Sequence, residues 1–267
     1  MKQLLTYFGL SYLISWTIWL PLYGHIFALT NLPTLPFHHA LGGLGPLIAS
    51  FLTTWIFLKT EGLKTLLKKC FQVKPLIYLT IALCSPFLLA IIASVINQFV
   101  HTKPIEITGL LTTKEFPNFN LLTFFIYNLI FFGFGEEVGW RGFALPRLQN
   151  KLNALAASIA LTFFWALWHL PLFFYRIGYT TMDMAGILGW VFSLLTGSIL
   201  LTWLFNSTRA GILICAIFHS TIDIAFTSDI ADENIVNYMG ILITIWGILT
   251  IIIFKPKNLA TNERERI

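Results

Sequence analysis

Long apolar runs dominate this sequence and limit what the chain can fold into. A helix that crosses a bilayer needs about 20 mostly apolar residues, and eight segments are suited to this. They cover residues 4–29, 38–58, 75–100, 121–140, 154–174, 185–205, 210–227 and 235–254. Only 11% of the residues are charged, whereas a soluble domain has about 25%. The sequence therefore predicts an all-α, polytopic membrane protein of about eight transmembrane helices, with residues 1–267 forming a single transmembrane domain.

The distribution of basic residues predicts how the helices are oriented. With both termini inside, the inner loops and tails hold 14 of the 17 Lys and Arg residues, and the outer loops hold only Lys103, Lys114 and Arg176. Cytoplasmic loops carry such an excess of positive charge, so we expect both termini in the cytoplasm. No organellar address is visible, which favours a bacterial plasma membrane. Outside the predicted membrane segments, aromatic and basic residues do not alternate as they do on a nucleic-acid-binding surface, so we expect no nucleic-acid partner.

The segment at 59–74 is the one connector with a clear pattern of its own. Apolar residues recur there at helical spacing, with lysines at the other positions. This pattern predicts an amphipathic helix in the inner interface, held by apolar burial and by anionic lipid headgroups. A plain basic loop is the alternative.

Neither the start of the chain nor its cysteines indicates processing or redox chemistry. The first apolar segment is too long for the core of a signal peptide, and no small-residue cleavage site follows it, so we expect it to stay as an anchor. Cys70, Cys84 and Cys215 are scattered without the spacing of a metal or redox site.

Ionisable side chains within the apolar segments are costly, about 2.5–3.5 kcal/mol each on insertion scales. In the fourth segment, FGEEVGWRGF places two adjacent carboxylates beside an arginine. Glu137 and Arg141 are four residues apart, so they can form an ion pair on a helix. Glu136 points about 100° away and has no partner nearby in the sequence, which suits a proton acceptor. The alternative is that Glu136 also pairs with Arg141, or with a distant base, and only holds helices together.

Three further polar groups lie in later apolar segments, whereas the other histidines fall at or near segment ends, where water is available. His169 lies among bulky aromatic residues, and His219 and Asp223 are four residues apart and share one helix face. At 1.5 Å per residue, Glu136 and His219 come to similar depths, and His169 comes out deeper. Each group has an alternative role as a hydrogen-bonding residue between helices. Convergence on one intramembrane polar site is the hypothesis.

These residues resemble three motifs of a known family, the CAAX-processing and bacteriocin-immunity (CPBP) proteases, which include the type II CAAX prenyl endopeptidase. The Glu-Glu-x-x-x-Arg motif is matched by Glu136, Glu137 and Arg141. A second motif places an aromatic residue, usually Phe, four residues before a histidine, and Trp165 and His169 match it. This sequence has Trp165 where the family usually has Phe, and we expect this difference to affect packing more than chemistry.

A third motif extends the resemblance toward the end of the chain. The pattern His-x-x-x-Asn or Asp is matched by His219 and Asp223. The similarity covers about residues 120–227, which we expect to form the catalytic core. Three motifs in the family's order are more specific than any one of them alone.

The resemblance implies an endopeptidase whose site lies within the membrane and opens toward the cytoplasm. On this basis Glu136, assisted by His169, would activate a water for attack on the scissile carbonyl, and His219 and Asp223 would stabilise the oxyanion. Glu137 and Arg141 would give structural support. An ionised Asp223 cannot donate a hydrogen bond, so it would act through His219.

The metal requirement is left open by the residues. Glu136, His169 and His219 are three possible zinc ligands with an open fourth position, but no His-Glu-x-x-His helix is present. A metal-free, glutamate-dependent mechanism is therefore favoured, and zinc is the alternative. No Gly-x-Ser-x-Gly elbow indicates a serine hydrolase.

Three functional hypotheses follow. The favoured one is an intramembrane endopeptidase acting on a hydrophobic, lipidated or membrane-tethered peptide, with membrane lipids as its surroundings. The second is a non-catalytic membrane scaffold or bacteriocin-immunity protein of the same fold. A proton- or cation-coupled transporter is less favoured, because no paired half-repeats with broken helices are visible.

Overall fold

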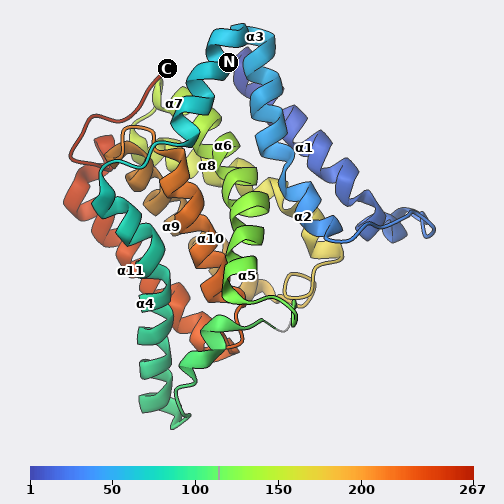
Figure 1. Ribbon diagram of the computed structural model, residues 1–267, viewed down its shortest axis with the longest axis vertical. Helices are drawn as coiled ribbons and strands as arrows, with labels where there is room; N and C mark the ends of the chain where they lie inside the picture. Colours follow the sequence, from blue (N-terminus) through green and yellow to red (C-terminus); the bar gives the residue numbers. More distant parts are fainter. Residues whose placement is uncertain (114) are drawn as a thin grey trace.

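The computed structural model describes residues 1–113 and 115–267; Lys114, assigned above to an outer loop, lies outside the described residues. Within these two ranges the chain is helical and has no β-strand, which confirms the all-α prediction. The helices in Figure 1 are α1 Lys2–Tyr23, α2 His38–Gly43, α3 Gly45–Cys70, α4 Leu76–His101, α5 Leu121–Asn128, α6 Gly135–Gly139, α7 Leu145–Gln149, α8 Ala154–Trp168, α9 Met184–Ser207, α10 Ile212–Thr227 and α11 Glu233–Asn258.

All eight predicted segments contain helix, and within the part of the chain that the structure describes six stretches are long and apolar enough to cross a membrane. These are His38–Cys70, Leu76–His101, Leu121–Gln149, Ala154–Phe174, Met184–Ser207 and Glu233–Asn258. The helix of the seventh segment, α10, is apolar but has only 16 residues. It lies near the middle of the bundle, packed against α3, α4, α5, α6 and α9. Protein therefore surrounds much of α10. The six apolar stretches confirm the prediction of a polytopic membrane protein.

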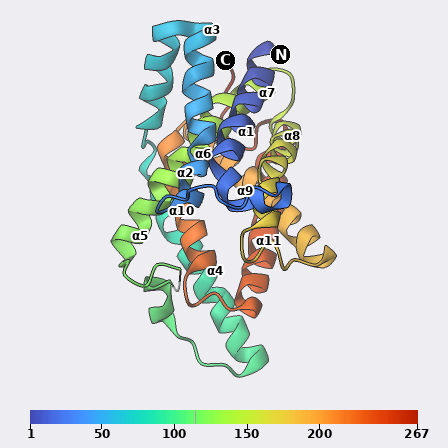
Figure 2. The same ribbon diagram turned by 90° about the vertical axis from the view of Figure 1, so that its right-hand side faces the viewer.

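The bundle has two distinct ends. Both termini and the bend of α3 lie at one end, which we call the terminal end (Figures 1 and 2). The loops that join α4 to α5 and α10 to α11 lie at the opposite, distal end. These two loops are tied together, since Asp229 N donates to Thr112 O and Ile230 N donates to Gly109 O.

One helical rod, residues 121–149, supplies both adjacent carboxylates. It comprises α5, α6 and α7, separated by two wider π-helical turns at Leu129–Phe134 and Trp140–Ala144. Such turns occur mostly as local bulges and are frequent at functional sites. A Cβ on Gly133 would lie 2.6 Å from the backbone oxygen of Ala216 in α10, so only glycine allows this close approach. The close packing brings α10 against the rod beside α6.

The segment predicted to form an amphipathic helix is the second arm of α3. The helix turns back at Lys59, where φ is 54°, and its second arm ends at Cys70. Leu66 and Cys70 are buried against the bundle, whereas Lys64 and Lys68 are exposed. The prediction of a helix is confirmed, and its apolar face packs at least partly on the protein itself.

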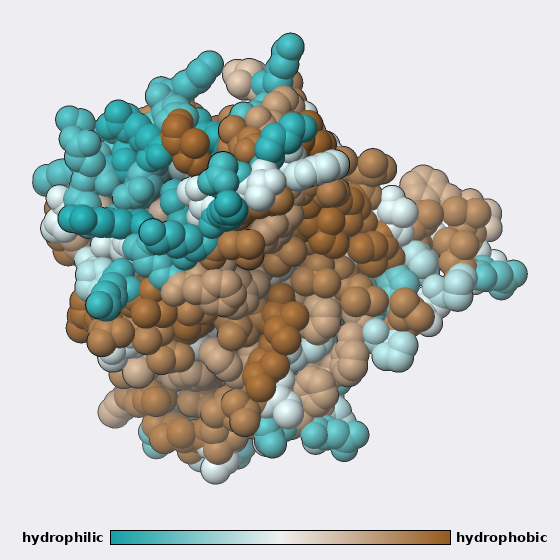
Figure 3. Space-filling model, turned by 45° about the horizontal axis from the view of Figure 1, so that its top comes forward, coloured by the Kyte–Doolittle hydropathy of each residue, from teal (hydrophilic) through white to brown (hydrophobic). Residues whose placement is uncertain are grey.

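The surface matches the membrane assignment. Hydrophilic residues gather over the terminal end, and a broad apolar surface lies beside them (Figure 3). Large apolar side chains are exposed along the outer helices, among them Leu88 of α4, Phe192 of α9 and Ile253 of α11. Contiguous apolar surface of this kind marks contact with lipid or a partner.

Candidate active site

Glu136 lies in α6 between the two π-helical turns and is 3% exposed. Its Oε2 accepts two indole hydrogen bonds, from Trp165 Nε1 at 2.6 Å and from Trp140 Nε1 at 3.3 Å. Besides its packing, Trp165 thus makes a hydrogen bond that a phenylalanine, which has no N–H to donate, could not make. No hydrogen bond from the described residues reaches Glu136 Oε1, which leaves that oxygen available to a water or substrate.

Glu137 is fully buried and forms the ion pair that its spacing predicted. Its Oε1 accepts from Arg141 NH1 at 2.9 Å. The same oxygen also lies 2.7 Å from His219 Nδ1 of α10, a contact that the local sequence pattern could not indicate. Glu137 therefore holds an imidazole as well as an arginine.

His219 lies between two carboxylates. Its Nδ1 faces Glu137, and its Nε2 lies 3.5 Å from Asp223 Oδ2, one helical turn further along α10. The second distance is too long for a strong hydrogen bond, so Nε2 remains free to contact another group. The side chain of Asp223 is 34% exposed, against 8% for His219. Asp223 is thus the more accessible member of the predicted pair.

His169 follows directly after α8 and is 8% exposed. Its Nδ1 lies 2.7 Å from the backbone oxygen of Trp165. Because a carbonyl oxygen only accepts, Nδ1 carries a proton and Nε2 is the free ring nitrogen. Trp165 therefore contacts both Glu136, through its indole, and His169, through its backbone.

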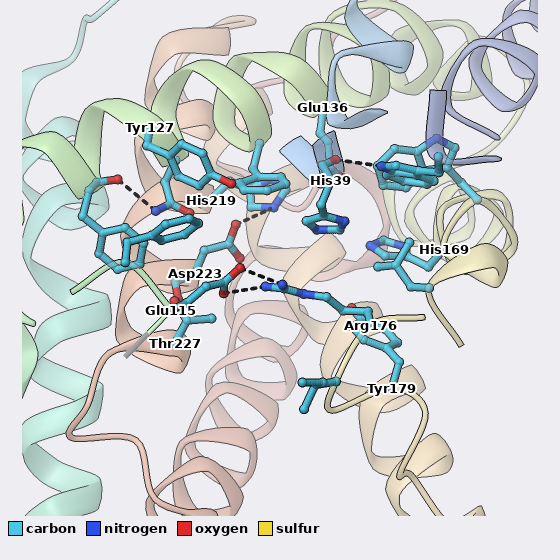
Figure 4. A pocket seen from close by; sticks show the side chains of 18 residues that line it. His39, Glu115, Tyr127, Glu136, His169, Arg176, Tyr179, His219, Asp223 and Thr227 are labelled. Carbon is cyan, nitrogen blue, oxygen red and sulfur yellow. Dashed lines mark hydrogen bonds and ion pairs between the residues drawn. The ribbon is translucent and has the colours of Figure 1, made fainter. Parts of the chain in front are cut away.

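A single cavity joins the four residues predicted to be catalytic. It has a volume of about 240 Å³, and Glu136, His169, His219 and Asp223 all line it (Figure 4). These side chains come from three predicted segments, and the cavity has room for a water and part of a peptide. The structure thus brings together the four residues that were expected to converge.

Other cavity residues were not predicted from the sequence. Arg176 and Glu115 form a two-point ion pair, NH1 to Oε1 and NH2 to Oε2, both at 2.6 Å (Figure 4). Burial alone would lower the pKa of the Arg176 guanidinium, and the bond to Glu115 outweighs this, so the pKa is raised. His39, placed above at a segment end, also lines the cavity, and its Nδ1 lies 2.8 Å from Tyr175 Oη. These residues form long-range contacts, for which the sequence offers no local signal.

The cavity extends from the carboxylates toward the distal end. Along α10 its wall runs through His219, Asp223 and Thr227, and the ion pair of Arg176 and Glu115 also lines it. The charge bias predicts that both termini are cytoplasmic, and the family resemblance implies that the site opens toward the cytoplasm. These two expectations are incompatible, because the cavity extends away from the end of the bundle that carries the termini.

The possible zinc ligands are not arranged as a metal site. Among the residues that the structure describes, no three His, Cys, Asp or Glu side chains are close enough together to hold a metal ion. Glu136, His169 and His219 line one cavity without forming such a group. The atoms of these residues without a strong hydrogen bond are Glu136 Oε1, His169 Nε2 and His219 Nε2.

The arrangement combines the groups that acyl transfer requires. A carboxylate oxygen and two ring nitrogens, His169 Nε2 and His219 Nε2, are free of strong hydrogen bonds around one small cavity. A base near a water and a donor near a developing negative charge are the two elements that a protein can supply to peptide-bond hydrolysis. Low dielectric around them strengthens both effects.

Comparison with known proteins agrees with the motifs. Residues 118–225 match the family described as Rce1-like, type II CAAX prenyl endopeptidase Rce1-like. A stretch of 44 residues is 48% identical to CAAX prenyl protease 2 of Methanococcus maripaludis. That stretch spans 16% of this chain and 16% of the relative's length. The resemblance to the CAAX-processing protease family is confirmed, and the match to that one relative is local.

Proposed function

We propose that this protein is an intramembrane endopeptidase that hydrolyses a peptide bond of a hydrophobic or membrane-tethered substrate. The observation that supports it best is the convergence of Glu136, His169, His219 and Asp223 on one cavity. Similarity to a CAAX prenyl protease supports the reaction class. Glu137 and Arg141 would act as buried supports, and residues 120–227 as the catalytic core.

In the proposed first step, Glu136 acts as the general base. Two indole donors hold Oε2, so a proton taken from water goes to Oε1, the oxygen without a protein partner among the described residues. The water oxygen then bonds to the scissile carbonyl carbon, and the carbonyl π electrons move to the oxygen. His169 Nε2 is free to accept a hydrogen bond and orient the same water.

The negative charge that develops on the carbonyl oxygen needs a donor. His219 can donate from Nε2 when both ring nitrogens carry protons, and Glu137 on Nδ1 supports that form. Asp223 at 3.5 Å adds a second carboxylate beside the same ring. When the tetrahedral intermediate collapses, the C–N bond breaks and Glu136 returns its proton to the leaving nitrogen.

The test compares cleaved peptides in membranes that contain wild-type protein with those that contain Glu136→Gln or His169→Ala. Mass spectrometry of membrane peptides identifies substrates of any sequence. We expect a loss of products of about 100-fold or more, the usual contribution of a general base. Glu61→Gln is the matched control, because Glu61 is an exposed carboxylate paired only with Lys64 among the described residues.

Products that persist at wild-type levels in both variants would overturn the hydrolase function. A cellular phenotype that also survives both substitutions would instead support a scaffold or immunity role for the same fold. Retained elution as a single species in detergent shows that each variant is folded. Glu136→Gln keeps an oxygen that can accept the two indole bonds, so the local structure is expected to survive.

A further inference from the structure

The cavity is closed toward the terminal end. The turn of the rod that follows the two carboxylates is packed in the core, where Trp140, Arg141 and Phe143 are 0–1% exposed. Trp168, 1% exposed, packs edge-on against Trp140, with ring centroids 5.9 Å apart. No water or substrate can pass through side chains packed at this density, so the terminal end is the floor of the site.

Exposure increases in the opposite direction. Along α10 the side chain of His219 is 8% exposed and that of Asp223 34% exposed, and Thr227, one turn further on, is exposed. The span from His219 to Thr227 is about 12 Å at 1.5 Å per residue. Ile177, which also lines the cavity, is 89% exposed. The mouth therefore lies on the distal side of the catalytic groups.

The charge distribution indicates which side of the membrane this is. The structure describes all of the 17 Lys and Arg residues except Lys114; of these, only Lys103 and Arg176 lie in loops on the distal side, and the other 14 lie on the terminal side or in the rod. Cytoplasmic loops carry the excess of basic residues. Hydrophilic side chains also gather over the terminal end (Figure 3). The floor of the site thus faces the cytoplasm, and its mouth faces away from it.

We infer that the site takes its substrate from the extracytoplasmic side, as a membrane-tethered peptide whose scissile bond lies beyond that surface or just within it. This inference rests on the proposed hydrolase function of the same cavity. The apolar and aromatic wall suits a hydrophobic segment, since Phe116, Phe124 and Phe132 line it. The ion pair between Arg176 and Glu115 joins two loops at the rim, and a peptide must pass beside it.

Cysteine labelling tests the side of access without requiring activity. In a background where Cys70, Cys84 and Cys215 are alanine, Ile177→Cys marks the mouth and Lys68→Cys marks the terminal end. Both native side chains are exposed, so neither substitution disturbs a packed contact. A membrane-impermeant maleimide is expected to label Ile177→Cys in intact cells, and Lys68→Cys only after permeabilisation. The reverse pattern overturns the inference, and so does labelling of both or of neither in intact cells.

A second arm separates this inference from the hydrolase proposal. A pool of internally quenched peptides, each with an acyl anchor that inserts into the outer leaflet of the vesicle and a charged group that prevents crossing, is added to right-side-out and to inverted vesicles. Cleavage above the Glu136→Gln background in right-side-out vesicles alone supports both proposals. Cleavage in inverted vesicles alone overturns the side of access and leaves the hydrolase intact. Cleavage in neither counts against the hydrolase, and the labelling result then decides the side of access by itself.

Discussion

Glu137 lies 2.7 Å from His219, through Oε1 and Nδ1, although the two residues are 82 positions apart in the chain. The same oxygen receives the guanidinium of Arg141 at 2.9 Å. One carboxylate therefore fixes a cation on its own helix and an imidazole on α10. In the proposed mechanism Glu137 acts only through His219, so it is a positioning residue.

Removing the charge of Glu137 is expected to destabilise the protein. Glu137→Gln leaves Arg141 as a buried, uncompensated cation, and breaking a buried pair in this way costs about 3–5 kcal/mol. The double variant Glu137→Gln with Arg141→Met removes both charges and is expected to recover much of that loss. Thermal unfolding in detergent measures the stability of the single and the double variant against the wild type. An equal loss in the single and double variants would contradict the pairing argument.

Trp165 is expected to contribute to catalysis through its indole N–H. Trp165→Phe keeps an aromatic ring but removes the 2.6 Å hydrogen bond to Glu136. Because a bond to a charged group is worth about 1.5–3 kcal/mol, kcat is expected to fall by about 10- to 100-fold. The donor favours the ionised carboxylate, so the acid limb of the pH–rate profile is expected to move to higher pH. Activity assays across pH measure both effects.

Trp203→Phe is the matched control for that variant. Trp203 is buried, and its Nε1 has no hydrogen-bond partner among the described residues. Its replacement removes an indole of the same kind without breaking a bond, so the pH profile is expected to stay unchanged. A shift of equal size in both variants would mean that general packing, rather than the bond to Glu136, explains the result.

Asp223 is expected to tolerate asparagine better than alanine. Asp223→Asn keeps a polar group of the same shape near His219 Nε2, at a position 3.5 Å away in the native protein. The amide can also donate to an oxyanion, which an ionised carboxylate cannot do. Asp223→Ala removes the group, and loss of one oxyanion-site group costs about 100- to 1,000-fold in kcat. Two variants that are equally inactive would show that the carboxylate itself is required.

Exhaustive chelation is expected to leave activity unchanged. The proposed reaction uses a carboxylate and two imidazoles, and the described residues hold no group of three ligands placed for a metal. The measurement is cleavage after dialysis against a strong chelator, followed by addition of zinc. Loss of cleavage that zinc restores would replace the glutamate mechanism with a metal-dependent one.

Loosening the rim is expected to affect substrate binding more than stability. Arg176→Gln breaks the two bonds to Glu115, and the two side chains are 30% and 36% exposed. An ion pair exposed to this degree contributes about 0–1 kcal/mol, so the thermal midpoint should change little. KM is expected to change while kcat is retained, because neither residue touches the proposed reacting atoms. A fall in kcat with KM unchanged would instead indicate that Arg176 takes part in the reaction.

The fold could be predicted from the sequence because apolar length and charge bias are local and additive signals. All eight apolar segments proved to be helical, and the i, i+4 spacing of Glu137 and Arg141 gave the correct ion pair. The motifs of the four proposed catalytic residues could likewise be read in three separate segments. Each of these features is visible in short stretches of the chain taken one at a time, whereas the convergence of the four residues on one cavity is a tertiary feature.

The remaining features depend on tertiary contacts, which no local pattern records. The bond from Trp165 to Glu136 joins residues 29 apart, and the pair of Arg176 and Glu115 joins residues 61 apart. The direction in which the cavity extends along the bundle has no local signal either, because it depends on which end of the bundle is filled by side chains. Here Trp140 and Trp168 fill the terminal end.

The π-helical turns on either side of Glu136 have a consequence for how this region can change in evolution. Each residue added to a helix rotates the following side chains by about 100° around its axis. The wide turns at Leu129–Phe134 and Trp140–Ala144 therefore determine the direction in which Glu136 and Glu137 point. A single-residue insertion or deletion in the rod would keep its apolar character and its ability to span the bilayer. It would nevertheless swing one carboxylate out of register with its partners. Homologues that retain the reaction should therefore vary in composition along this rod, but not in its length.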